Sequence, residues 1–374
     1  MAPEVIDRPL QHFTILSDLP LDRRRSAPNQ LRWMVGSLLV FALCARGAAG
    51  GASEFVYVSD ERGNEVTAID LSDGTVVARI AVGKRPRGIQ TSRDGALLFV
   101  AVSGSSIAGP GVDESKLPPA DRTADGIAVV DTATGKVLRV LKAGTDPEAF
   151  ALGPDGKILY AANEDASLVS VIDATGRSQL RQTKVGAQPE GIAVTPDGER
   201  IFVASEASDV VTMLDARTLS PVKTLAIAGR PRTLLTSGDG SVIYAAIETA
   251  GQVAVISAAN GDLQKLIDVA GGDRAVRPMG LVEARGGRSL FVTTGWAGAI
   301  LELDVARGTL IRRIDGVGAR PWGIALSADG QTLVTANGPS GDISLIDRAS
   351  GEVRARYKIG VSPWGVAMKP IDAT

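Results

Sequence analysis

The chain has 374 residues, with 40 Lys and Arg against 42 Asp and Glu, which gives a formal net charge of −2. This balance offers no basic surface of the kind that binds nucleic acid or an anionic membrane. One Cys and one His, Cys44 and His12, exclude a disulfide framework and leave few ordinary ligands for zinc, copper or haem iron.

Residues 1–49 have the character of a secretory signal. Arginines at 23–25 and 32 precede an apolar run at 34–45, and small residues follow at 47–49. A basic segment, an apolar segment and a small-residue cleavage site are typical of a signal peptide, and the run is short for a membrane span. We therefore expect a signal peptide at about 23–49 and a periplasmic or secreted mature chain without His or Cys. An uncleaved anchor is the alternative.

The rest of the chain is built from a module that recurs seven times, with its clearest copy, 42 residues long, at 189–230. This copy contains four short runs of β-branched or alternating residues, which begin at 189, 201, 210 and 222. Each run is bounded by Gly, Pro, Asp or Ser. The pattern predicts four short antiparallel strands in each module.

Three landmarks can be followed through the modules. An aromatic or apolar residue marks the second strand: Tyr57, Phe99, Tyr160, Phe202, Tyr244, Phe291 and Val334. The third strand ends at Asp70, Asp131, Asp173, Asp215, Ser257, Asp304 and Asp347. A proline opens the next first strand: Pro86, Pro147, Pro189, Pro231, Pro278, Pro321 and Pro363. From proline to the next second-strand landmark the separation is 13 residues in all six cases.

Seven sheets with such regular spacing can bury one another's faces only by packing radially around an axis. The sequence therefore predicts an all-β protein, a seven-bladed β-propeller of four-stranded antiparallel blades over residues 50–374. The chain starts with a second strand (54–59) and stops after a first strand (364–369). We expect the C-terminal strand to complete the N-terminal blade.

Two loops depart from the common length. A long insert occupies 103–124, rich in Gly, Pro and charge, and a shorter excess lies at 271–277. In a propeller, loops from second to third strands and from fourth to first strands share one face. Functional insertions concentrate on such loops, so we predict that this face carries the function. Neutral drift of loop length is the alternative.

Charged and aromatic residues surround the prolines on this face. The candidate binding residues for a ligand or partner are Arg85, Arg87, Asp146, Glu148, Glu190, Arg230, Arg232, Arg277, Trp296, Arg320, Trp322 and Trp364. Second-to-third loops add Asp60, Glu61, Arg62, Asn163, Glu164, Asp165, Glu206 and Asn337. Arginines beside tryptophan faces suit a planar or carboxylate-bearing ligand.

Two alternatives stay open at these positions. Arg85 and Arg87 could pair with Asp146 and Glu148 on the next blade, and the repeated Pro-Trp-Gly could be packing at the closure of the ring. The aspartates of the hairpin turns and of the third-strand ends are interpreted as structural, because Asp caps backbone amides in turns.

No catalytic residues, metal site or cofactor are assigned, because the mature chain lacks the His and Cys of common nucleophile and metal systems. No glycine-rich phosphate loop leads from a strand into a helix. Acid–base chemistry by Glu148 and Glu190 remains an alternative. Whether the protein is an enzyme is uncertain from the residues, and the balance favours a protein without enzymatic activity.

Several segments resemble a known repeat family. Tyr-Val-Ser-Asp (57–60), Tyr-Ala-Ala-Asn (160–163) and Gly-x-x-Pro-x-Gly (83–88, 186–191, 318–323, 360–365) resemble the YVTN-type β-propeller repeat over residues 54–370. The segments 59–66, 109–122 and 319–326 are similar to periplasmic propellers associated with catabolism that depends on pyrroloquinoline quinone (PQQ). The resemblance implies an accessory protein of quinoprotein alcohol oxidation without an established activity of its own.

From these observations we expect a secreted, monomeric, non-enzymatic binding protein. Its partner would be a quinoprotein dehydrogenase or its cytochrome, or a small carboxylate or quinone ligand, and not nucleic acid or a membrane. The alternatives are a His-independent hydrolase or lactonase that uses carboxylates, and a surface-layer-type structural protein.

Overall fold

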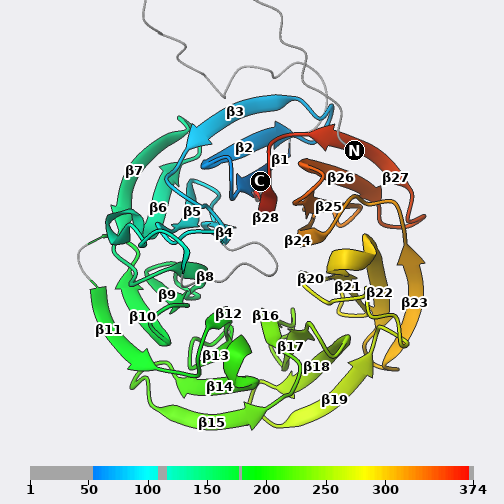
Figure 1. The fold of residues 1–374 in the computed structure, drawn as a ribbon. Helices are drawn as coiled ribbons and strands as arrows, with labels where there is room; N and C mark the ends of the chain where they lie inside the picture. Colours follow the sequence, from blue (N-terminus) through cyan, green and yellow to red (C-terminus); the bar gives the residue numbers. More distant parts are fainter. Residues whose placement is uncertain (1–53, 108–115, 177–178, 370–374) are drawn as a thin grey trace, which may run out of the picture. The chain divides into compact units, whose positions relative to one another are not determined.

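The computed structural model describes residues 54–107, 116–176 and 179–369, all within one compact unit of the chain (Figure 1). The signal peptide predicted at 23–49 lies outside the described residues. Within the unit, seven four-stranded antiparallel sheets form a ring. This confirms the predicted seven-bladed β-propeller.

The strands of each blade run in order from the channel outward. The first blade is β28 (Pro363–Met368), β1 (Phe55–Asp60), β2 (Glu65–Asp70) and β3 (Val76–Ala81). The second is β4 (Ile89–Thr91), β5 (Leu97–Val102), β6 (Gly126–Asp131) and β7 (Lys136–Leu141). The third is β8 (Pro147–Leu152), β9 (Ile158–Asn163), β10 (Leu168–Asp173) and β11 (Gln179–Lys184). The fourth is β12 (Pro189–Val194), β13 (Arg200–Ser205), β14 (Val210–Asp215) and β15 (Pro221–Ala226).

The fifth blade is β16 (Pro231–Thr236), β17 (Val242–Ile247), β18 (Gln252–Ser257) and β19 (Leu263–Asp268). The sixth is β20 (Leu281–Glu283), β21 (Ser289–Thr293), β22 (Ile300–Asp304) and β23 (Thr309–Ile314). The seventh is β24 (Pro321–Leu326), β25 (Thr332–Asn337), β26 (Asp342–Asp347) and β27 (Val353–Lys358). Single 3-10 turns, η2 (Arg122–Ala124), η3 (Glu206–Ser208) and η4 (Gly295–Ala297), lie between second and third strands.

The core lies between neighbouring blades. Second strands such as β5 are buried on both faces after their first residue, whereas the outer strand β15 alternates between exposed and half-buried positions. One apolar cluster joins Tyr57 and Val66 of the first blade to Leu98 and Val100 of the second. Each blade therefore covers the face of the next, which is why the repeat needs a closed ring.

The proline that opens each first strand is called the rim proline below. Glycine follows the rim proline by two residues in five blades, because neighbouring inner strands pack backbone to backbone there. A Cβ on Gly191 would lie 1.9 Å from the carbonyl oxygen of Arg232, and one on Gly280 would lie 2.2 Å from that of Trp322. No side chain fits at such distances. The residue between proline and glycine is thereby held at the top of the inner strand.

The ring closes as predicted, with β28 as the inner strand of the first blade. Tyr57 faces Ala367 in the β1–β28 register, and Lys369 donates its backbone N–H to the carbonyl of Phe55. The carboxylate of Asp60 accepts the backbone N–H groups of Val361 and Ser362 at 2.6 and 2.8 Å. Residues about 300 positions apart thus fasten the two ends.

The turn aspartates are structural, as interpreted. Asp131 at a third-strand end accepts the backbone N–H and the hydroxyl of Thr134, both at 2.8 Å. Asp197 in a hairpin turn accepts the backbone N–H of Glu199 at 2.9 Å. Both are Asx-type turns.

Candidate functional site: the charged mouth of the channel

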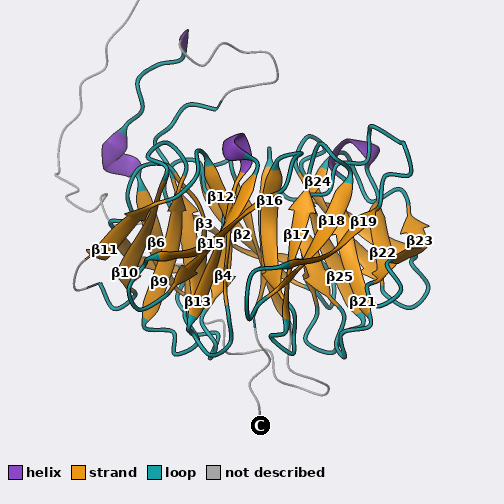
Figure 2. Ribbon diagram, turned by 90° about the horizontal axis from the view of Figure 1, so that it is seen from below, coloured by secondary structure: helices purple, strands orange, loops and turns teal. Residues whose placement is uncertain are grey.

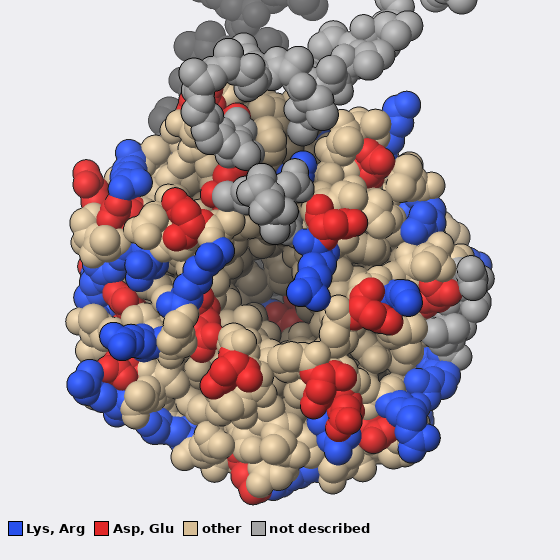
Figure 3. Space-filling model, turned by 180° about the vertical axis from the view of Figure 1, so that it is seen from behind, with Lys and Arg blue, Asp and Glu red and all other residues tan. Residues whose placement is uncertain are grey.

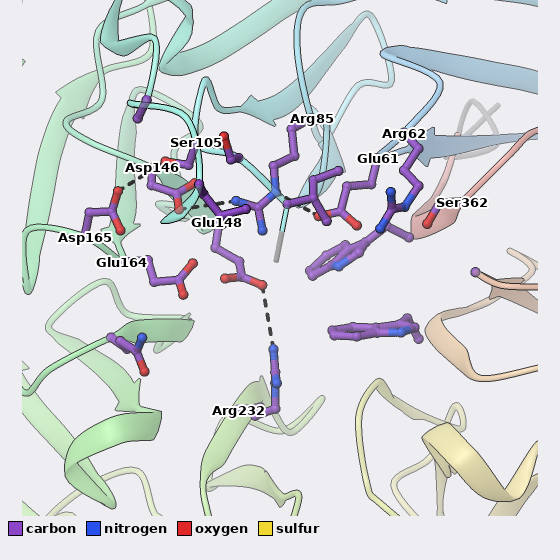
Figure 4. Close-up of a pocket in the computed structure, with 18 of the residues that line it drawn as sticks. Glu61, Arg62, Arg85, Ser105, Asp146, Glu148, Glu164, Asp165, Arg232 and Ser362 are labelled. Carbon is purple, nitrogen blue, oxygen red and sulfur yellow. Dashed lines mark hydrogen bonds and ion pairs between the residues drawn. The ribbon is translucent and has the colours of Figure 1, made fainter. Parts of the chain in front are cut away.

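The two loop types predicted to share a face do so, on the upper side in Figure 2. Residues of both types line one cavity, which we call the mouth of the central channel. This cavity has a volume of about 820 Å³. Described residues of the insert form part of its wall, among them Ser105, Ile107 and Leu117. The loops of both types supply most of the charged wall, and the inner strands add Glu148 and Arg232 (Figure 4).

The residue before the rim proline has an unusual backbone conformation in five blades. Its φ is positive at Arg85, Asp146, Gln188, Arg230 and Arg320, with values from 46° to 61°. Residues other than Gly rarely adopt this left-handed conformation, and it concentrates at sites that hold side chains in fixed positions. Here the turn sends a long side chain into the mouth before the inner strand begins.

Arg87 is the centre of one half of the mouth. Its side chain is 1% exposed and contacts three carboxyl groups: that of Asp146, that of Glu148 at 2.8 Å and that of Glu164 at 3.2 Å. Arg85 contacts Asp146 at 3.4 Å. Burial lowers the pKa of Arg87, but these carboxylates outweigh it and raise the pKa above the usual range. Arg87 is therefore permanently charged.

Arg232 is the centre of the other half. Its guanidinium lies 2.5 Å from Glu190, 3.1 Å from Glu248 and 3.3 Å from Glu206. Glu148 lies 3.8 Å away, and Figure 4 shows the two side chains pointing toward one another across the cavity. Glu148 thus links the two halves into one network.

Among the described residues, the ion-pair network has more carboxyl groups than arginines. Arg230 adds a contact to Glu206 at 2.5 Å, Arg277 one to Glu248 at 3.2 Å, and Arg85 one to Glu61 at 2.9 Å. Its seven carboxyl groups are Glu61, Asp146, Glu148, Glu164, Glu190, Glu206 and Glu248, and its five arginines are Arg85, Arg87, Arg230, Arg232 and Arg277. With all seven carboxyl groups ionised, the network would carry a net charge of −2. Because unbalanced buried charge is costly, we expect two of these carboxyl groups to be protonated.

The first of these protons is shared between Glu148 and Glu164. Burial, then the charge of Glu148 and a hydrogen bond with it, raise the pKa of Glu164 to about 9. Burial disfavours charge on Glu148 as well, but Arg87, the bond from Glu164 and Arg232 outweigh this and lower its pKa to about 2. At neutral pH, Glu164 therefore donates a hydrogen bond to the Glu148 carboxylate.

The second proton lies between Glu190 and Glu206. Burial, opposed by Arg232 and reinforced by the charges of Glu148 and Glu206, raises the pKa of Glu190 well above its usual range. Among the described residues, the buried Oε2 atoms of Glu190 and Glu206 have no hydrogen-bond partner, and Arg232 lies 3.3 Å from that of Glu206. The raised pKa of Glu190 favours this carboxyl group as the holder of the second proton.

Tryptophans and one arginine form the part of the mouth that lies outside the ion-pair network. The guanidinium of Arg320 lies 4.4 Å from the ring centre of Trp296 and 4.8 Å from that of Trp322. The rings of Trp322 and Trp364 are 5.5 Å apart. Burial and the charge of Arg232 lower the pKa of Arg320. Arg320 takes part in none of the ion pairs found within 54–107, 116–176 and 179–369.

Eight of the twelve candidate residues line this cavity, namely Arg85, Asp146, Glu148, Arg230, Arg232, Arg320, Trp322 and Trp364. Glu190 lines a second cavity, and Arg87, Arg277 and Trp296 are absent from the described wall of the mouth. Eight of the twelve form ion pairs with one another or with neighbouring glutamates, so the pairing alternative is confirmed for that part of the set. Arg320, Trp296, Trp322 and Trp364 lie outside the network. Glu248 was not among the residues predicted from the sequence. It stands four residues after the landmark Tyr244, as Glu61, Glu164 and Glu206 stand after theirs, so the repeat position could have found it.

Comparisons with known proteins support the fold. The family described as Cytochrome D1 heme domain matches residues 120–238, about a third of the chain. The periplasmic gluconolactonase of Pseudomonas aeruginosa is similar in structure, with a TM-score of 0.69 and 21% identity over 86% of this chain and 100% of that chain. Hydrazine synthase of Kuenenia stuttgartiensis has a TM-score of 0.64 and 22% identity over 76% and 90% of the two chains. No curated protein matches the sequence.

These matches do not include the YVTN repeat family or a protein linked to PQQ, so both remain resemblances. A haem is also not supported by the donor set. Haem iron takes His, Cys, Met or Tyr, and the described wall of the mouth contains none of these residues.

Metal binding and membrane insertion find no support in the described residues. No group of three or more His, Cys, Asp or Glu in them is arranged to hold a metal ion. In the same ranges, no helix is long and apolar enough to cross a membrane.

Proposed function

We propose that this propeller binds a small carboxylate-bearing molecule at the channel mouth, with Arg320 as the group that receives the carboxylate. The observation that carries the proposal is the contrast between Arg320 and the other arginines around it. Arg87 and Arg232 each contact three or more carboxyl groups. Arg320 is partly buried and has no carboxylate partner among the described residues. Arg62 also lacks one, but it is exposed.

The tryptophans favour a ligand with a flat or apolar body. An arginine held between two indole rings keeps its in-plane N–H groups free for a carboxylate, because the rings cover only its faces. A bidentate arginine–carboxylate pair at a partly desolvated site is among the stronger hydrogen-bonded contacts. The indoles of Trp322 and Trp364 then offer apolar surface beside it.

PQQ, which carries carboxylates on a flat ring system, is the ligand that the sequence resemblance suggests. On this proposal the protein acts in the periplasm as a non-enzymatic accessory to a quinoprotein dehydrogenase or its cytochrome. The resemblance of the segments at 109–122 and 319–326 supports this finer assignment.

Hydrolysis of a lactone is the second candidate, and a specific observation favours it. Glu148 and Glu164 are neighbouring carboxyl groups whose pKa values are driven apart, to about 2 and about 9. Such a split separates a general base from a general acid. The similarity to a gluconolactonase structure is in keeping with this reading, although at 21% identity it concerns the fold.

A calorimetric titration distinguishes the candidates. PQQ, benzoate, gluconate and a purified quinoprotein dehydrogenase would be titrated into the wild type, into Arg320→Gln and into Arg62→Gln as the matched control. We expect saturable carboxylate binding that weakens about tenfold or more in Arg320→Gln only. Hydrolysis of gluconolactone that is lost in Glu148→Gln would favour the lactonase. No response to any compound would contradict both and leave a structural role.

A further inference from the structure

A second cavity lies directly beneath the mouth, inside the channel. It has a volume of about 240 Å³, and it shares Trp322 and Trp364 with the cavity above. On the opposite face of the propeller the centre is visibly hollowed (Figure 3). The tryptophan pair therefore stands where the charged mouth meets the channel.

The wall of this lower cavity is chemically unlike the mouth. It consists of glycines, which the backbone packing of the inner strands requires, and of apolar side chains such as Ile192, Leu234 and Ile324. Gln90 and Thr233 are polar, and Glu190 is the sole ionisable residue of this wall among the described residues. Burial and neighbouring carboxylates raise the pKa of Glu190, and its carboxyl group lies 2.5 Å from Arg232, so it places no unbalanced charge in the channel.

The two cavities adjoin at Trp322 and Trp364, and their far ends differ in character. Arg320, which has no carboxylate partner among the described residues, stands at the upper end, tryptophan faces lie at the junction, and a largely apolar chamber lies at the lower end. A molecule with hydroxyl groups along its length would lose water in the chamber and find few side-chain hydrogen-bond partners there, since Gln90, Thr233 and Glu190 are the polar side chains of its described wall. A molecule with an apolar tail would gain free energy from the same burial.

We propose that the ligand of this site is an amphipathic monocarboxylate, whose carboxylate binds Arg320 and whose apolar body passes the tryptophan pair into the channel. The inference rests on the proposed binding of a carboxylate at Arg320 and narrows the ligand class to molecules with a single carboxylate, a class that does not include PQQ. It predicts that affinity grows with the length of the apolar body and stops growing when the chamber is filled.

The test is a calorimetric titration of the full chain with acetate, butyrate, hexanoate and octanoate, all below micelle-forming concentrations. Each methylene buried should tighten binding roughly fourfold, until a plateau is reached. The same series would be measured in Thr233→Phe, which adds bulk to the chamber wall, and in Val222→Phe, a matched increase in size on the exposed outer strand β15. Melting temperature would check folding, and Ala149→Leu replaces Thr233→Phe if that variant does not fold.

In the wild type and in Val222→Phe, hexanoate should bind much more tightly than acetate, and in Thr233→Phe the ratio of the two affinities should approach one. Equal affinity for all chain lengths in the wild type would overturn the amphipathic ligand while leaving carboxylate binding intact. So would a chain-length gain that persists in Thr233→Phe, because the tail would then lie elsewhere. Absence of binding by every member would instead remove the proposed function itself.

Discussion

Replacing Glu164 by Gln should stabilise this protein, which is the opposite of what the loss of a buried ion pair usually does. Glu164 lies 3.2 Å from Arg87, so its geometry alone suggests a stabilising contact. Yet Arg87 is already neutralised by Asp146 and Glu148. The pKa of Glu164 is raised to about 9 by burial and by Glu148, so the folded protein must keep it protonated.

The sign follows from proton linkage. The unfolded chain releases this proton near pH 4.5, the ordinary value, whereas the folded chain releases it near pH 9. Stability from this group is full below pH 4.5 and declines up to about pH 9, by about 1.4 kcal/mol per pH unit. Glutamine has the same shape, donates an N–H to Glu148 and has no proton to lose. At pH 7 the variant should therefore be more stable by roughly 1–3 kcal/mol.

Glu148→Gln should have the opposite effect and destabilise the protein. The pKa of Glu148 is lowered to about 2 because Arg87 and Arg232 outweigh the effect of burial. Removing this carboxylate takes one charged partner from each of two buried guanidinium groups, and breaking a buried ion pair typically costs about 3–5 kcal/mol. Glu352→Gln on the exposed surface serves as the control and should change little.

Urea unfolding of the four proteins between pH 5 and pH 9 measures these effects. The gain from Glu164→Gln should increase with pH, while Glu148→Gln should remain destabilised throughout the range. A destabilised Glu164→Gln variant, or a gain that does not depend on pH, would refute the shared proton. The charge balance of the mouth would then need another explanation.

Three other changes test the fold and the mouth. Gly191→Ala should destabilise the protein by several kcal/mol in urea unfolding, because its Cβ would lie 1.9 Å from a carbonyl oxygen, whereas at Gly338 the nearest atom is 3.5 Å away and the same substitution should be mild. Deleting 361–374 removes β28 and should abolish the cooperative transition in calorimetry, while a retained sharp transition would show that the ring does not need this strand. Arg87→Met should cost about 3–5 kcal/mol and Arg320→Met less than about 1 kcal/mol, since only Arg87 has carboxylate partners; equal losses would contradict this distinction.

The sequence was sufficient for the blade count, for the closure and for placing the two loop types on one face, because these depend on spacing. The sequence separation from Pro86 to Phe99 is the same as that between the corresponding residues of the other modules. It indicates hairpins of equal length, whatever side chains they carry. The late start and early stop of the module then require β28 to join β1.

The pairing within the mouth could not be predicted in the same way. Arg232 reaches carboxylates on three different blades, and those choices depend on side-chain length and on the left-handed turns before the prolines. Arg and Gln seldom adopt the left-handed conformation, so their presence before a proline does not predict it. The shared protons depend on burial, which appears only once the blades are assembled. What distinguishes Arg320 is the absence of a described carboxylate partner, which only the assembled network reveals.

The most direct test of the account is a crystal structure of the protein with 4-bromobenzoate, whose two ends can be told apart by the anomalous scattering of bromine. We predict that the carboxylate lies within hydrogen-bond distance of Arg320 and that the bromine points past Trp322 and Trp364 into the channel. A carboxylate bound at another arginine, or a bromobenzoate bound elsewhere on the propeller, would contradict the assignment of Arg320 as the receptor of the ligand.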